Sequence, residues 1–212
     1  MYRGRTLILS MAAIALAAGC TTSAPASSPD ASASSAAGGA SPSGGAGGLA
    51  DPAALQGRWW SWAASAPRDS NPVRDPDGTF CAENQAPDVW FLAGNFGGES
   101  RRTCSVPAGL PVAFPVVNFT GTADDCKTAM ADANGTAVLD GKPLDVVRHA
   151  AVPIRIKGVQ GNPVTREAGT FSTRACGLWV KLDSLPTGPH SLSISGSSGD
   201  FRLDVTYALQ VG

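Results

Sequence analysis

The sequence has few of the residues on which most enzymes and nucleic-acid-binding proteins depend. Its 212 residues include two histidines, and charged residues make up 16% of the chain, which carries a formal net charge of −1. No dense basic cluster occurs, so nucleic acid is not expected as a partner. The pattern GxSxG is absent. His149 lies in a connection and His190 at the start of a strand-like segment, so neither predicts a serine hydrolase triad.

Metal-binding patterns are equally sparse. No CxxC or HxxxH spacing is present, which argues against a zinc site. The segment Asp75-Pro76-Asp77-Gly78 places two carboxylates before a turn-forming glycine, so Asp75 and Asp77 are candidate calcium ligands. The third ligand and the distant glutamate of an EF-hand loop are missing. Because Asp and Gly are also common turn residues, an ordinary turn is the alternative, and no other cofactor is expected.

Carboxylates are a further class of catalytic residue that the chain carries sparingly. A glycoside hydrolase needs two of them flanking the scissile bond. The glutamates are Glu83, Glu99 and Glu167, and the sequence brings no two of them together. A wall-directed glycoside hydrolase that uses carboxylates is therefore an alternative function, and solvated loop acids are the simpler interpretation.

No apolar run reaches the roughly 20 residues that a membrane-spanning helix needs. A shorter one, residues 7–18, follows Arg3 and Arg5, and this layout is typical of an export signal. The residues Leu16-Ala17-Ala18-Gly19-Cys20 resemble the bacterial lipobox. The resemblance implies that residues 1–19 are a signal peptide and that Cys20 carries diacylglycerol and acyl chains such as palmitate. An ordinary signal peptide with a chance cysteine is the alternative.

Residues 20–50 are expected to be a disordered linker behind this anchor. Residues 21–50 contain no aromatic residue, one charged residue and one large apolar residue, Leu49. Such a segment buries too little surface to offset its ordering entropy. A Gly/Ser-rich coil of this length spans roughly 30 Å, which is enough to hold a folded domain away from a membrane.

Residues 51–212 have the length of one domain. Four cysteines lie in this range, and Cys20 precedes it. An even number in an exported domain predicts two disulfides among Cys81, Cys104, Cys126 and Cys176. Four cysteines allow three pairings. We favour Cys81–Cys104 with Cys126–Cys176, because the first pair brackets a compact unit of sequence.

The hydrophobic pattern predicts an all-β domain. Residues 201–211 alternate strictly between apolar and polar, which predicts a half-buried strand that pairs with 190–195 as a hairpin. Asp51 and Pro52 predict the start of an N-terminal helix over 51–66, and a short internal helix is expected at 122–133. Many short strands with abundant Gly and Pro indicate a β-sandwich, expected to resemble a jelly roll.

Two of the five tryptophans are candidate binding residues. Trp60 falls off the apolar face of the predicted N-terminal helix, and Trp179 falls opposite Leu178 and Val180 on its strand. A tryptophan on a solvent-facing surface can stack on a sugar ring or anchor a protein partner. The alternative is a tryptophan-rich core beneath the helix.

Residues 59–118 resemble a group of exported bacterial proteins that has no assigned activity. The matching segments are Trp60-Ser61-Trp62, Val89-Trp90-Phe91-Leu92-Ala93-Gly94 and Phe114-Pro115-Val116-Val117-Asn118. The resemblance implies export and supplies no mechanism. We therefore expect an extracytoplasmic, lipid-anchored protein whose non-catalytic domain binds envelope carbohydrate or a protein partner. A structural envelope protein without a small ligand is a further alternative.

Overall fold

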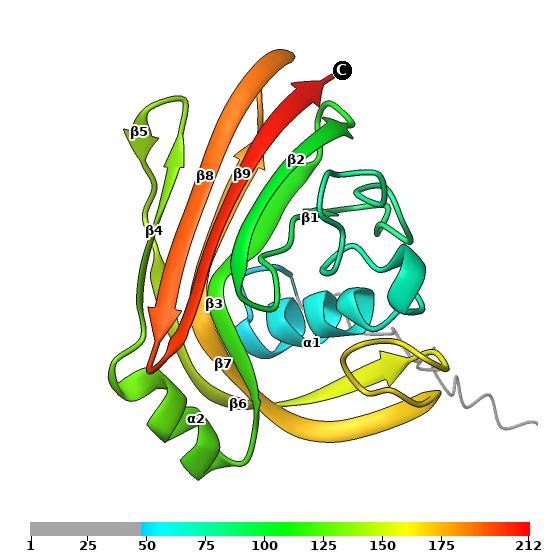
Figure 1. Cartoon of the computed structure of the whole chain (residues 1–212), viewed down its shortest axis with the longest axis vertical. Helices are drawn as coiled ribbons and strands as arrows, with labels where there is room; N and C mark the ends of the chain where they lie inside the picture. The colour runs from blue at the N-terminus through cyan, green and yellow to red at the C-terminus, as the bar shows by residue number, and fades with distance from the viewer. Residues whose placement is uncertain (1–47) are drawn as a thin grey trace, which may run out of the picture. The chain divides into compact units, whose positions relative to one another are not determined.

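The computed structural model describes residues 48–212, which form a two-sheet β-sandwich with two α-helices (Figure 1). The expected leader 1–19, the expected anchor at Cys20 and residues 21–47 of the expected linker lie outside the described residues. Among residues 48–212, no helix has the length and apolar content needed to cross a membrane. The predicted all-β sandwich with an N-terminal and an internal helix is confirmed.

The first sheet has four strands in the order β1-β3-β7-β6. Its strands are β1 (Trp90–Phe91), β3 (Pro111–Gly121), β7 (Gly169–Ser184) and β6 (Val147–Gly158). Strand β7 pairs antiparallel with both of its neighbours, and β1 pairs parallel with β3. The central strands β3 and β7 each have a run of six consecutive buried residues, so both faces of this sheet are covered.

The second sheet has five strands in the order β2-β9-β8-β4-β5. Its strands are β2 (Gly98–Val106), β9 (Phe201–Val211), β8 (Gly188–Ser198), β4 (Asn134–Leu139) and β5 (Lys142–Pro143). The predicted C-terminal hairpin is confirmed as β8 and β9. Strand β2 runs parallel to β9, so the two sheets differ from an all-antiparallel jelly roll by one parallel pair each.

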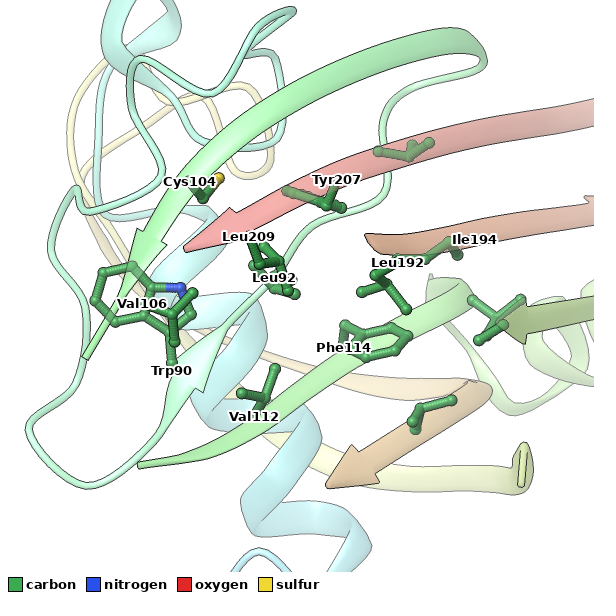
Figure 2. Packing of buried hydrophobic residues seen from close by; sticks show 14 of the residues in the cluster. Trp90, Leu92, Cys104, Val106, Val112, Phe114, Leu192, Ile194, Tyr207 and Leu209 are labelled. Atoms are coloured by element: carbon green, nitrogen blue, oxygen red, sulfur yellow. The ribbon is translucent and has the colours of Figure 1, made fainter. Parts of the chain in front are cut away.

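The space between the two sheets holds the main core (Figure 2). Strand β9 contributes every second residue to it, and Leu203, Val205, Tyr207, Leu209 and Val211 are all buried. The face predicted from their period-two spacing is therefore the core face. Each large aliphatic side chain buried here stabilises the fold by about 1.5–3 kcal/mol relative to solvent exposure.

A second core lies on the outer face of the first sheet, beneath helix α1 (Pro52–Ala63). The Asp51 carboxylate caps this helix by accepting the N–H groups of Ala53 and Ala54 at 3.3 and 3.1 Å. Leu49, expected in the linker, packs against the same core. The folded domain therefore includes residues just before Asp51.

Helix α2 (Ala123–Ala131) is tied to the first sheet. Thr122 and Asp125 form a capping box at its start. A disulfide joins Cys126 in this helix to Cys176 in β7, and the second disulfide joins Cys81 to Cys104 in β2. Both favoured pairings are confirmed, with Cα atoms 5.8 Å apart in each. Two disulfides indicate that the chain folds in an oxidising compartment.

Candidate functional site

The described residues enclose a small pocket between α1, β3, β9 and the loop at 94–96. Its cavity volume is about 190 Å³. Five aromatic rings and two amides line it, and we call it the aromatic pocket: Trp59, Trp60, Phe96, Phe119, Phe201, Asn95 and Asn118. An apolar cavity of about 150 Å³ holds one benzene molecule, so this pocket has the size for a single ring with a few further atoms.

Helix α1 supplies the two indole rings of the wall. The Trp59 Nε1–H donates to the carbonyl of Leu92 at 2.9 Å, which fixes that ring. Trp60 packs edge-to-face against Trp59, with ring centroids 5.2 Å apart and planes at 90°. Such pairs add about 0.5–1.5 kcal/mol beyond their buried area. The Trp60 ring is therefore held in place before any ligand arrives.

The other side of the pocket comes from the sandwich and from an exposed rim. Phe119 at the end of β3 packs against Phe201 at the start of β9, with centroids 6.2 Å apart. Phe96 stands on the adjoining loop with 51% of its surface exposed. Asn95 holds this loop, because its amide donates to Gly98 and its carbonyl oxygen accepts the Gly97 N–H. Phe96 therefore places a half-exposed ring at the rim of the aromatic pocket.

The polar groups of the aromatic pocket are few. Trp60 and Asn118 both line it, and the Trp60 Nε1 and Asn118 Nδ2 atoms are buried without a hydrogen-bond partner among residues 48–212. Buried donors normally find an acceptor, because leaving one unpaired costs about 1–3 kcal/mol. No Asp, Glu, His, Lys or Arg lines the pocket. The arrangement supplies no acid, base or nucleophile and is suited to binding.

The two tryptophans predicted to bind ligands differ in their surroundings, because Trp60 lines the aromatic pocket and Trp179 does not. Trp60 lines the aromatic pocket and is 9% exposed. Trp179 is 1% exposed and packs against Trp59 at 5.8 Å, so the prediction that it lies on a solvent-facing surface is wrong. Its strand alternates as expected, with Leu178 and Val180 in the main core. The opposite face is covered by α1 and belongs to the second core.

The carboxylates proposed as calcium ligands shape a turn. Asp75 is buried, and its oxygens accept the backbone N–H groups of Asp77, Gly78 and Phe80 at 2.8–3.2 Å. The Asp77 carboxylate accepts both the hydroxyl and the N–H of Thr79, which lowers the pKa of Asp77. The oxygens of Asp75 therefore stabilise a turn, and calcium binding by Asp75 and Asp77 stays a prediction.

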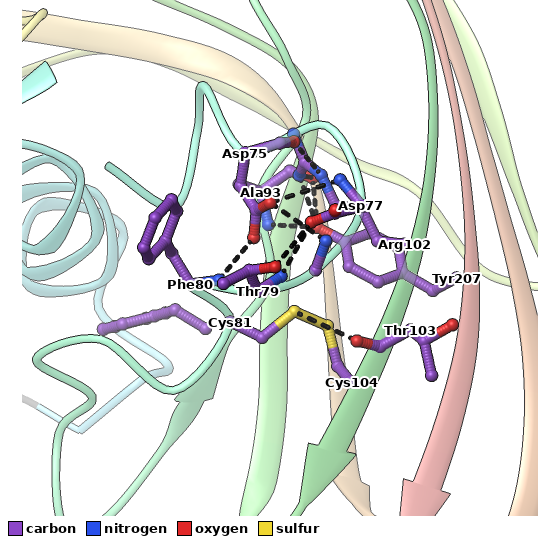
Figure 3. The surroundings of a disulfide bond; sticks show 12 residues. Asp75, Asp77, Thr79, Phe80, Cys81, Ala93, Arg102, Thr103, Cys104 and Tyr207 are labelled. Atoms are coloured by element: carbon purple, nitrogen blue, oxygen red, sulfur yellow. Dashed lines mark hydrogen bonds between the residues drawn. A yellow bond between two sulfur atoms is a disulfide. The ribbon is translucent and has the colours of Figure 1, made fainter. Parts of the chain in front are cut away.

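Beside that turn, the buried side chain of Arg102 connects three segments of the chain (Figure 3). Its guanidinium donates to the carbonyls of Val73, Asp75, Ala93 and Gly94 and to the Tyr207 hydroxyl, at 2.7–3.1 Å. No carboxylate among residues 48–212 pairs with it. The role of Arg102 is therefore structural, because its side chain joins the loop before Cys81 to the β-sandwich.

The other residues considered for catalysis lie away from the aromatic pocket. Glu99 and Glu167 are exposed and Glu83 is half-buried, and none of them lines the pocket. The His190 Nδ1–H donates to the Asp140 carboxylate at 2.7 Å, and this hydrogen bond raises the pKa of His190 and lowers that of Asp140. Burial lowers the pKa of His149. The two histidines are on separate strands, β6 and β8.

A larger hollow of about 770 Å³ lies along the other side of α1. It is open to solvent and includes the basic side chains of Arg58, Arg155 and Lys157, of which Arg58 forms an ion pair with Asp88. The aromatic pocket is the better candidate site, because it is more enclosed and five aromatic rings line it.

The expectation that Trp60 is solvent-facing is wrong, because Trp60 is buried in the second core, and the other rings of the aromatic pocket were not expected from the sequence. Phe96, Phe119 and Phe201 come from segments far apart in the chain, and only the pairing of β3, β9 and α1 brings them together. The weak signals available were an isolated Phe96 between Asn95 and two glycines, and Asn118 at the polar end of an apolar run.

These features define the candidate site as an apolar, aromatic-lined pocket on a helix-covered β-sandwich. No family model matches the chain, and no curated protein matches it. Two solved structures are similar to 59% of the chain, each at 11% identity. They are the cysteine protease inhibitor EhICP2 from Entamoeba histolytica (TM-score 0.27, 96% of that chain) and amebosin (TM-score 0.21, 100% of that chain). At these TM-scores the likeness supports no conclusion about fold or function.

Proposed function

We propose that this protein is a lipid-anchored, extracytoplasmic binding protein whose β-sandwich holds an apolar ring in the aromatic pocket. The observation that carries the proposal is the pocket itself. It combines five aromatic rings, one of them the exposed Phe96 at the rim, with no acidic or basic side chain among its lining residues. Small-molecule sites in proteins have this composition, with a mostly apolar wall and few polar groups.

The composition of the wall favours an apolar molecule over the envelope carbohydrate expected from the sequence. A sugar ring carries several hydroxyl groups, and each one buried without a partner is costly. Among the residues that line the aromatic pocket, the side chains with polar atoms are the amides of Asn95 and Asn118 and the indoles of Trp59 and Trp60, and the Trp59 N–H already donates to Leu92. The absence of acidic and basic side chains from this wall likewise favours binding over glycoside hydrolysis, which requires two carboxylates.

The anchor is the second part of the proposal. It is supported by the lipobox resemblance at Leu16–Cys20 and by the two disulfides, which form in oxidising compartments. Two or more acyl chains would hold the protein stably, since each buried CH₂ contributes about 0.8 kcal/mol. The composition of residues 21–50 suits a spacer between the membrane and the binding domain.

We predict that Cys20→Ser abolishes incorporation of labelled palmitate, because serine offers no thiol for the lipid. The measurement is metabolic labelling of cells that express the full chain, followed by fractionation. The substituted protein should leave the membrane fraction. Undiminished labelling of the serine variant would disprove the anchor and leave the binding proposal untouched.

We predict that Phe96→Asp weakens binding of toluene by about tenfold, because it replaces an apolar rim with a charge beside the ligand. Titration of the full chain, followed by the indole N–H resonances in ¹H–¹⁵N spectra, gives the dissociation constants. Phe96 is half exposed, so the thermal midpoint should move little.

The matched control is Val147→Asp. The exposed fraction of Val147 is 52%, which nearly equals the 51% of Phe96, and Val147 does not line the aromatic pocket. This variant should bind toluene as the unsubstituted protein does. Equal losses of toluene affinity in both variants would show that the pocket is not the site. Binding of the protein to a sugar on a glycan array would overturn the preference for an apolar ligand.

A further inference from the structure

Positive charge is unevenly distributed over the folded domain. Residues 148–181 contain six basic residues and one acidic residue, Glu167. The rest of residues 48–212 contains eight basic and fifteen acidic residues. The six basic residues are dispersed along the sequence, but all of them fall on the paired strands β6 and β7 or on the loop between these strands. Folding therefore gathers a surplus of positive charge on one hairpin of a domain that is otherwise acidic.

Three of these basic side chains share one face of the hairpin. Arg155 and Lys157 are two residues apart in β6, so both point away from the buried Ile156 between them, which packs beneath α1. Arg174 of β7 is paired with Pro153, which places it on the same face and diagonal to Arg155. All three side chains are exposed. We call Arg155, Lys157 and Arg174 the basic face.

No carboxylate among residues 48–212 forms an ion pair with the basic face, because the two ion pairs of this part of the chain lie elsewhere. Arg174 donates to the carbonyl of Ala151 at 3.3 Å, and this contact leaves its charge uncompensated. Like charges on neighbouring positions of a sheet repel one another. A partner that carries negative charge would relieve this repulsion.

The start of the folded domain lies beside the same hairpin. Ala53, in the first turn of α1, lines the open hollow of about 770 Å³ together with Arg155 and Lys157. Helix α1 packs along β6 (Figure 1), where the Ser61 hydroxyl accepts the backbone N–H of Lys157 at 3.1 Å. The segment that precedes Asp51 therefore enters the domain next to β6.

We propose that the basic face docks the domain onto the anionic lipid surface in which Cys20 is anchored. This inference rests on the anchor part of the proposed function and adds a contact surface to it. Residues 21–50 span roughly 30 Å as a coil, and they join the domain beside β6, so the hairpin lies within reach of the membrane. The tether raises the effective concentration of lipid, so a weak contact suffices.

Electrostatics determine the expected strength of this contact. Each Lys or Arg near an anionic lipid surface strengthens binding by about fivefold. The three side chains of the basic face together therefore contribute about a hundredfold. The acidic remainder of the domain is repelled by the same surface, which orients the basic face toward the lipid. Salt should weaken the attraction, because it decays within a Debye length of about 8 Å at physiological ionic strength.

The test uses the full chain with Cys20→Ser, because this substitution removes the acylated residue and leaves the basic face as the attachment under study. Cosedimentation measures partitioning onto vesicles of phosphatidylcholine alone and onto vesicles that contain equal parts of phosphatidylcholine and phosphatidylglycerol. The protein should prefer the anionic vesicles by about a hundredfold, and raising NaCl from about 0.05 M to about 0.5 M should remove most of this preference.

Adding Arg155→Gln, Lys157→Gln and Arg174→Gln together should lower partitioning onto the anionic vesicles by about a hundredfold. Partitioning onto phosphatidylcholine alone should stay the same. All three side chains are exposed, so the thermal midpoint should move little.

The matched control replaces Arg74, Arg101 and Lys142 with glutamine. These residues are again two arginines and one lysine, all three are exposed, and none lies on the β6–β7 hairpin. The control variant has the same net charge as the basic-face variant. Its partitioning onto the anionic vesicles should stay within about threefold of the parent chain.

The outcomes separate the docking surface from the rest of the account. Equal losses in the two triple variants, or no partitioning of the parent chain onto anionic vesicles at low salt, would overturn the docking proposal. Binding of the basic face to soluble polyglutamate without binding to vesicles would assign it to an acidic polymer and also overturn the proposal. Palmitate labelling at Cys20 and toluene binding are read independently, so either part of the proposed function can fail while vesicle binding by the basic face stands.

Discussion

Replacing Arg102 with alanine is expected to lower the free energy of unfolding by about 4 kcal/mol. Four carbonyls and the Tyr207 hydroxyl would lose their common donor in a buried position. Each buried polar group left unpaired costs about 1–3 kcal/mol, and removing one side of a buried charged contact costs about 3–5 kcal/mol. The free energy of unfolding of a whole domain is about 5–15 kcal/mol, so this single change removes a large share of it.

Urea denaturation followed by tryptophan fluorescence measures this loss. Arg101→Ala is the matched control, because Arg101 is the preceding residue of β2, carries the same charge and is exposed. Its effect should stay within about 0.5 kcal/mol. Similar losses for the two variants would show that the buried hydrogen bonds of Arg102 contribute no special stability.

Removal of the Cys126–Cys176 disulfide is expected to have a comparable effect. The two cysteines are 50 residues apart, and the loop-entropy relation gives about 4 kcal/mol for a loop of that length. The same relation gives about 3.4 kcal/mol for Cys81–Cys104, whose cysteines are 23 residues apart. Double substitution of each pair by alanine, followed by urea denaturation, measures both values.

The order of the two losses is informative as well. The longer loop should give the larger loss, since it restricts the unfolded chain more. A larger loss for Cys81→Ala/Cys104→Ala would mean that this bond also supports the nearby turn at Asp75 and the Arg102 contacts (Figure 3). Unchanged stability in both double variants, or a free thiol at Cys81, Cys104, Cys126 or Cys176 in the unsubstituted protein, would contradict the disulfide assignment.

Local patterns predicted the parts of the fold that local physics determines. The alternation over 201–211 predicted β9 and its buried face, and Asp51-Pro52 predicted the start of α1. The disulfide pairing followed from the compact segment between Cys81 and Cys104. In each case the decisive interactions lie within the segment or close to it in sequence.

Long-range packing determined what sequence reasoning missed. Strand β7 begins at Gly169, yet only 178–182 was predicted, because its first half is polar and small. The parallel pairing of β2 with β9 joins residues about a hundred positions apart and has no local pattern. Arg102 occupies a core-facing position of β2, where its charge argued for solvent.

In the candidate site, too, local patterns predict some features and long-range packing alone produces the others. Trp179 falls on the face of β7 that its alternation predicts, and only the position of α1 makes that face a core. Trp60 was singled out because it leaves the apolar face of the helix, and it does line the aromatic pocket. The remaining rings, Phe96, Phe119 and Phe201, become neighbours only when the sandwich has formed.

The most direct test of the binding proposal is the position of a bound ring. Intermolecular nuclear Overhauser effects between the ring protons of toluene and the full chain locate it without any substitution. We expect contacts to Trp60, Phe119 and Phe201, which share the aromatic pocket. Contacts confined to the open hollow beside Arg58 and Trp62, or no contacts at saturating toluene, would contradict the proposal.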